Sequence, residues 1–208
     1  MTQALACFNN HGLILATDSL ATRFTEANQP EFFNVEKLYA LGAYNAVLSG
    51  GAGVSVPLTL ALRYEINRRR GLEDVEEIVE FALSFLSLGY GRYLEQHGPE
   101  PEGFRRLYFI IAGYSPHRPP PGFALFLLGS EENELPLRLM SASNLIVMPR
   151  NLGMEMRLSR AIAAQASLSE LLQLARDFLE KQAAMKEEVG PPFYFATITS
   201  QGYQPVIM

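Results

Sequence analysis

The chain has 208 residues, of which 48% are hydrophobic and 19% charged, as in an ordinary globular protein. Its net charge of −5 argues against a nucleic-acid partner, and its single cysteine, Cys7, excludes an internal disulfide. No apolar run approaches the ~20 residues of a membrane helix, and the first residues lack the basic and apolar regions of a signal peptide. We therefore expect a cytoplasmic protein with no membrane partner. We also expect no metal and no cofactor, because the three histidines are scattered.

The first half of the chain predicts two hairpins followed by two helices. Turn residues at 9–12 and 42–45 separate short apolar runs, which is typical of β-hairpins. Leu58, Leu62 and Ile66 repeat at the spacing of one helical face, and Pro57 stands near the start of that helix. The expected elements are strands 4–8 and 13–17, a polar loop from 18 to about 36, strands 37–41 and 46–49, and helices 54–70 and 73–96.

The second half repeats this order. Ser167 and Glu170 have the spacing of a capping box at the start of a helix. The expected elements are strands 107–112, 123–128, 135–140 and 145–148, helices 154–166 and about 168–186, and strands 193–199 and 203–207. Hairpins alternating with helix pairs predict an α+β fold, namely a four-layer αββα sandwich of two antiparallel sheets. We expect one domain spanning residues 1–208.

Three motifs in the first 55 residues resemble those of proteasome β subunits, which are N-terminal-nucleophile hydrolases. Thr2 opens the first strand, and Gly12–Ser19 ends the second strand in Ala-Thr-Asp-Ser, at the family's separation between its threonine and its acid. The strand Lys37–Leu41 resembles the family strand whose lysine lies beside the threonine. The turn Ser49–Gly53 is similar to the family's small-residue turn, where a glycine N–H forms the oxyanion hole.

Later segments agree more loosely. Ile110–Tyr114 resembles the family's apolar strand that ends in glycine, and Val189–Phe193 is similar to the corresponding segment of Anbu proteins, a bacterial branch related to the proteasome. For the family's active-site serine between the two halves, the candidates are Ser141 and Ser143, of which Ser143 is favoured. The family's aspartate and serine before the closing strand have no clear match, and Lys186–Val189 occupies that region.

The resemblance implies a threonine-type peptidase. Thr2 would be the nucleophile and its own α-amine the base, because a free α-amine has a pKa of about 7.7–8.0. Lys37 would stabilise developing negative charge, Asp18 would hold Lys37, and the N–H of Gly51, or second of Gly50, would bind the oxyanion. This chemistry requires that Met1 be removed, as is expected for Met before a small residue.

Each of these residues also has an ordinary structural interpretation. Asp18 suits a strand-end turn, Lys37 a charged strand edge, and the glycines a tight turn. However, Lys37 is the only lysine before residue 181 in a chain with 17 basic residues. A compact ammonium therefore stands at the position where the implied mechanism needs one.

The partners implied are a peptide or unfolded-protein substrate, a homo-oligomeric ring and, by resemblance, an ATP-dependent unfoldase. The helices at 54–70 and 73–96 are richer in apolar residues than one inward face needs, since Phe81, Phe85 and Leu88 broaden the stripe. Two alternative functions stay open. One is a catalytically inactive structural subunit of the same fold, and the other is an N-terminal-nucleophile amidohydrolase that acts on a small molecule.

Overall fold

The computed structural model describes residues 2–24, 29–69, 71–100 and 104–207. Within these ranges the strands and helices alternate in blocks, as the sequence predicts. The elements are β1 (Ala4–Asn9), β2 (Gly12–Thr17), β3 (Leu20–Phe24), β4 (Pro30–Asn34), β5 (Leu38–Ala40), β6 (Asn45–Gly51), α1 (Ser55–Arg68), α2 (Val75–His97), β7 (Leu107–Tyr114), β8 (Phe123–Ser130), β9 (Arg138–Ala142), β10 (Leu145–Met148), α3 (Leu152–Ala163), α4 (Leu168–Ala183), β11 (Tyr194–Thr199) and β12 (Gly202–Val206).

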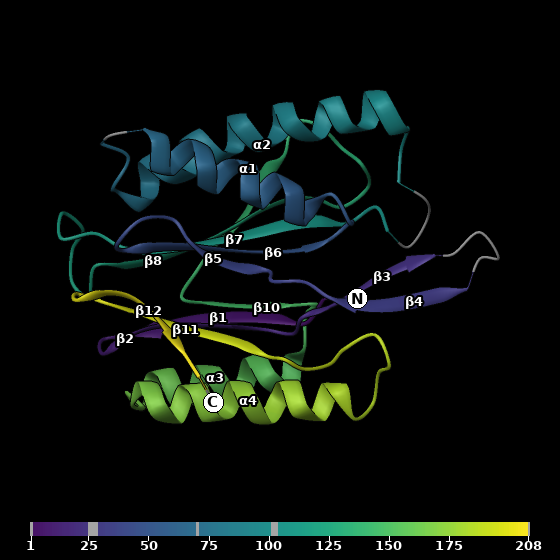
Figure 1. Cartoon of the computed structure of the whole chain (residues 1–208). Helices are drawn as coiled ribbons and strands as arrows, with labels where there is room; N and C mark the ends of the chain where they lie inside the picture. The colour runs from purple at the N-terminus through teal and green to yellow at the C-terminus, as the bar shows by residue number, and fades with distance from the viewer. Residues whose placement is uncertain (1, 25–28, 70, 101–103, 208) are drawn as a thin grey trace.

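Two five-stranded sheets lie in the middle of the molecule, with a helix pair over the outer side of each (Figure 1). One sheet has the order β10-β1-β2-β11-β12 and faces α3 and α4. The other has the order β5-β6-β7-β8-β9 and faces α1 and α2. All pairings are antiparallel. The α+β class is therefore confirmed, and the layers are compatible with the predicted sandwich.

The strands are apolar on both sides because both sides of each sheet are covered. In β1, Ala4 and Ala6 belong to the core between the sheets, whereas Leu5 and Cys7 belong to the core under α3 and α4. Successive side chains of a strand point to opposite faces, so a strand buried on both faces needs an apolar residue at every position. This explains why β1 and β2 are continuous apolar runs in the sequence.

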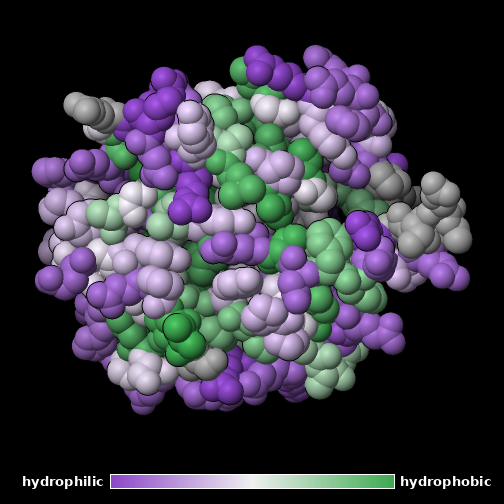
Figure 2. All heavy atoms as spheres, in the orientation of Figure 1, coloured by the Kyte–Doolittle hydropathy of each residue, from purple (hydrophilic) through white to green (hydrophobic). Residues whose placement is uncertain are grey.

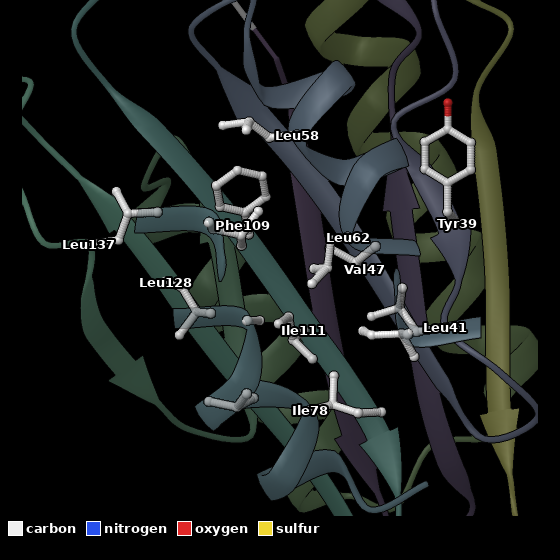
Figure 3. Packing of buried hydrophobic residues seen from close by; sticks show 14 of the residues in the cluster. Tyr39, Leu41, Val47, Leu58, Leu62, Ile78, Phe109, Ile111, Leu128 and Leu137 are labelled. Carbon is white, nitrogen blue, oxygen red and sulfur yellow. The ribbon is translucent and has the colours of Figure 1, made fainter. Parts of the chain in front are cut away.

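A third core fills the space between α1, α2 and their sheet (Figure 3). Leu62 of α1 and Ile78 of α2 pack in one cluster with Val47, Phe109 and Leu128 from three adjacent strands. The predicted helical face of α1 is confirmed, because its spaced leucines point into this cluster. The aromatic side chains that broaden the apolar stripe of α2 do not form an exposed surface. They lie partly buried against the same cluster, and among the three stripe residues only one is largely exposed: Phe81 and Phe85 are packed, and Leu88 is exposed.

The expectation of a polar loop from residue 18 to about 36 is wrong. This segment contains the strands β3 and β4, which pair with each other in the register Leu20↔Asn34. All five residues of β4 are exposed, so this strand has no buried face and its sequence shows no apolar alternation. In Figure 1 the hairpin projects from the end of the molecule at which β1 begins.

The predicted capping box is confirmed. The Ser167 side chain accepts a hydrogen bond from the Glu170 N–H, and the Glu170 side chain accepts one from the Ser167 N–H. The strands β9 and β10 are close in the chain but belong to different sheets, since β10 pairs with β1. This crossing brings the chain from one sheet to the other beside the end of β1, where the Phe8 N–H donates to the Asn144 carbonyl at 3.1 Å.

On the face shown in Figure 2, hydrophobic residues form separate patches among hydrophilic ones, at the upper middle, right of the centre and at the lower left. The middle of this face corresponds to the sheet layers of Figure 1, and the outer sides to the helices. Among the helices within the described ranges, none has the length and hydropathy to span a membrane.

Candidate active site

The carboxylate of Asp18 is the centre of a buried polar cluster at the end of β2. Its side chain is fully buried and accepts hydrogen bonds from the Gln3 N–H at 2.9 Å, the Leu20 N–H at 3.1 Å and Lys37 Nζ at 3.1 Å. The Asp18 N–H in turn donates to the Gln3 carbonyl at 3.1 Å. Asp18 therefore ties the end of β2 to the residue that follows Thr2.

Lys37 stands directly before β5 and is 3% exposed. Its ammonium donates to Asp18 Oδ1 and, at 2.6 Å, to the Leu20 carbonyl. Burial lowers the pKa of Lys37, and the Asp18 carboxylate opposes that decrease. Burial likewise raises the pKa of Asp18, against the opposing effects of Lys37 and the Gln3 N–H. A buried ammonium with a lowered pKa gives up or shares a proton more readily than an exposed lysine does.

Thr2 precedes β1, is almost completely buried and lines the same cleft as Lys37. The alternation of β1 puts Thr2 on the side of Ala4 and Ala6, which face the space between the two sheets. The Thr2 carbonyl accepts a hydrogen bond from Tyr108 Oη at 3.2 Å. With the Gln3 N–H bonded to Asp18, the backbone on the carboxyl side of Thr2 is held from two directions.

Tyr108 was not found by sequence reasoning. It lies in β7 directly opposite Gly50 of β6, and its ring occupies the space that a side chain at position 50 would need. A Cβ atom on Gly50 would collide with the Tyr108 hydroxyl. Burial raises the pKa of Tyr108 far above its ordinary value, and the Asp18 charge adds to this rise, so the phenol stays a hydrogen-bond donor. The structure thus gives Gly50 a steric role beside Thr2.

Gly51 ends β6 and lines the cleft together with Thr2 and Lys37. Its φ is +90°, a conformation that favours glycine, and a Cβ atom there would collide with the Arg106 carbonyl. The neighbouring amides are engaged: the Ser49 N–H donates to the Lys37 carbonyl at 3.0 Å, and the Ala52 N–H to the Arg106 carbonyl at 2.7 Å. The end of β6 is therefore fixed directly beside Lys37.

The cleft has a volume of about 1460 Å³. Residues of the β3–β4 hairpin and of the start of α1 form mostly apolar walls. The strands β8, β9 and β10, the segment before β7, the start of α3 and the turn at Glu188 also line the cleft. The apolar wall residues include Leu20, Ala21, Phe32, Phe33, Val56 and Pro57. The hairpin that the sequence misses is thus one wall of the cleft.

Of the two serine candidates, only Ser141 lines the cleft. Ser143 lies in the exposed turn between β9 and β10, where its hydroxyl donates to the Leu145 carbonyl at 2.7 Å. The structure therefore brings together Thr2, Asp18, Lys37 and Gly51, but not Ser143. Ser143 has the ordinary role of a turn residue.

Chemically, the cluster joins a threonine, a buried ammonium, a buried carboxylate and a glycine-rich strand end. A hydroxyl beside a positive charge is more easily deprotonated, and amide N–H groups near it can bind a developing oxyanion. Neither the comparison with models of known protein families nor the comparison with curated proteins finds a match for this chain.

Proposed function

We propose that the chain is a threonine-type peptidase with the N-terminal-nucleophile hydrolase fold, similar to proteasome β subunits. One observation carries the proposal. The buried pair of Asp18 and Lys37 is hydrogen-bonded to the residue after Thr2, at a cleft that both Thr2 and Lys37 line. Burying two opposite charges costs desolvation free energy. Buried ionisable groups with shifted pKa values are concentrated at catalytic and binding sites.

In the proposed reaction, Thr2 Oγ attacks the carbonyl carbon of the scissile amide while its proton passes to the Thr2 α-amine. The carbonyl electrons move to the oxygen, and the Gly51 N–H stabilises this oxyanion, an effect worth roughly 3–4 kcal/mol where one such donor has been removed. The tetrahedral intermediate collapses with loss of the amine product, which takes up the proton. Water then hydrolyses the Thr2 ester and frees the acid product.

Lys37 and Asp18 act on the charge of Thr2 in this scheme. The Lys37 ammonium stabilises the threonine alkoxide as it forms, and Asp18 and the Leu20 carbonyl hold that ammonium in place. Tyr108 fixes the Thr2 carbonyl. The scheme requires a free α-amine on Thr2, so Met1 must be removed before the protein can act.

The size of the cleft favours a peptide over a small molecule. Sites for small molecules typically measure about 300–1,000 Å³, and this cleft of about 1460 Å³ exceeds that range. We therefore propose a peptide or an unfolded protein segment as the substrate. We further propose that the protein is a cytoplasmic homo-oligomer that works with an ATP-dependent unfoldase.

The direct test is hydrolysis of fluorogenic peptides by protein whose intact mass shows that Met1 is absent. Thr2→Ala should abolish turnover and Thr2→Ser should retain part of it, because serine keeps the hydroxyl. Thr22→Ala, a change in another cleft-lining threonine, is the matched control and should stay near wild type. If Thr2→Ala keeps wild-type turnover, the mechanism is refuted. If protein without Met1 hydrolyses no peptide, the inactive structural subunit becomes the better account.

A further inference from the structure

The charged side chains around the cleft are compensated in pairs. Among the residues that line it, each basic side chain has a carboxylate partner within ion-pair distance. The pairs are Lys37–Asp18 at 3.1 Å, Arg105–Glu132 at 3.1 Å, Arg106–Glu131 at 3.0 Å and Arg150–Glu155 at 3.0 Å. These charges therefore cancel locally and offer little net attraction to a charged substrate.

Glu188 is the exception among the cleft's carboxylates. It lines the cleft and is half-buried, yet within the part of the chain that the structure describes it forms neither an ion pair nor a side-chain hydrogen bond. A carboxylate that has lost part of its water and has no cation partner is unfavourable unless a ligand supplies the missing charge. The described lining of the cleft thus carries one uncompensated negative charge.

The backbone fixes Glu188 close to the catalytic cluster. Val189 is buried, and its N–H donates to the Lys186 carbonyl at 3.2 Å, which closes a turn. The next carbonyl, of Gly190, accepts from the Ser19 N–H at 3.3 Å. The turn around Glu188 is therefore attached to the segment that begins at Asp18.

Gly190 also packs tightly against β3. A Cβ atom at this position would lie 2.8 Å from Leu20 Cδ1, so the absence of a side chain permits the close approach. Leu20 is the residue whose carbonyl binds the Lys37 ammonium. Glu188 is thus carried by a segment that is anchored on both Ser19 and Leu20.

We infer that Glu188 is a specificity-determining residue that binds the cationic side chain of a substrate lysine or arginine. The inference rests on the proposed function, since it takes the cleft for the peptide-binding site. Lysine and arginine have long apolar stems with a charged head. This form fits a cleft with apolar walls and one free carboxylate.

The test uses fluorescently labelled hexapeptides in a neutral background, each with one lysine at a different position, together with a glutamine and a glutamate counterpart of each. Binding is measured by anisotropy and turnover by product formation. Variants Glu188→Gln and Glu188→Lys are compared with Glu187→Gln, which changes an exposed neighbour that does not line the cleft.

Wild type should bind the lysine peptide about three- to tenfold more tightly than its glutamine counterpart for at least one position. Glu188→Gln should remove this preference, Glu188→Lys should transfer it to a glutamate peptide, and Glu187→Gln should retain it. The preference should weaken as salt is raised, because ions screen a partly exposed pair.

Several results would overturn the inference. One is equal binding of lysine and glutamine peptides at every position, and another is a preference that survives in Glu188→Gln. A third is a loss of turnover in Glu188→Gln that is the same for all peptides, which would assign the carboxylate to Thr2 and not to the substrate. Charge preference in binding without hydrolysis would support Glu188 while refuting the peptidase. Hydrolysis without charge preference would do the reverse.

Discussion

Lys37 Nζ lies 3.1 Å from Asp18 Oδ1, and neither side chain is more than 3% exposed. The two residues come from different sheets, since Asp18 follows β2 and Lys37 precedes β5. The ion pair therefore links the two sheets at the cleft end of the molecule. An ammonium so well buried would be strongly unfavourable without its carboxylate.

Asp18→Asn should destabilise the protein by about 3–5 kcal/mol, because it leaves the Lys37 ammonium buried without a counter-charge. Urea denaturation measures this change. Glu31→Gln is the matched control, since Glu31 also pairs with a cation, Arg23, but both side chains are at least half exposed. The control should leave stability almost unchanged, because exposed ion pairs contribute little. Equal effects of the two changes would contradict the description of a buried pair.

Lys37→Arg should remove most turnover. Arginine keeps the charge but replaces a compact ammonium with a broad planar group, and a misplacement of about 1 Å can cost on the order of a hundredfold in rate. If Lys37 were an exposed charge at the edge of a strand, the substitution would leave the free energy of unfolding unchanged. Because Lys37 is buried, overpacking should instead cost about 1–3 kcal/mol. Peptide hydrolysis and a melting curve check both numbers, and unchanged turnover would remove Lys37 from the mechanism.

Tyr108→Phe should lower the turnover rate markedly while it lowers the free energy of unfolding only slightly. The change removes the hydrogen bond to the Thr2 carbonyl, which is worth about 1 kcal/mol in stability. It also releases the residue that carries the nucleophile. Tyr93→Phe is the control, because Tyr93 Oη bonds Glu100 away from the cleft. If both variants keep full turnover, Tyr108 has a structural role only.

Self-association through α1 is the fourth prediction. Leu60 and Tyr64 stand four residues apart on this helix and are 44% and 71% exposed, so an apolar strip faces outward. We expect a homo-oligomer in which this strip is covered. Leu60→Glu with Tyr64→Glu should yield smaller particles in light scattering, and Ser159→Glu, an exposed change on α3, should not. A wild-type monomer at micromolar concentration would refute the prediction.

The sequence predicts most of the strands and helices because a buried face requires hydrophobic residues at regular spacing along the chain. The spacing of Leu58, Leu62 and Ile66 predicts α1. The continuous apolar runs predict the strands that are buried on both faces of their sheet. The hairpin of β3 and β4 leaves no such period, because β4 is exposed at every position. Its pairing is visible only in the structure.

The site was predictable to the extent that local motifs carry it. Asp18, Lys37 and Gly51 follow from spacing and resemblance, and the structure shows their proximity. Tyr108 lies 106 residues from Thr2 and reads as a core aromatic in an apolar strand. The contact of Tyr108 with Thr2 depends on the register between β6 and β7, which no local sequence pattern predicts. Ser143 was favoured over Ser141, but the structure places Ser143 in an exposed turn and Ser141 in the lining of the cleft.

The central claim is that Thr2 acts through both its hydroxyl and its own amine. A peptide epoxyketone tests it most directly, because the hydroxyl attacks the ketone and the amine opens the epoxide. After digestion, mass spectrometry should find the adduct on the peptide that begins with Thr2. Protein that retains Met1 should remain unlabelled, since its Thr2 nitrogen is an amide. Equal labelling of both forms, or an adduct on another residue, would contradict the account.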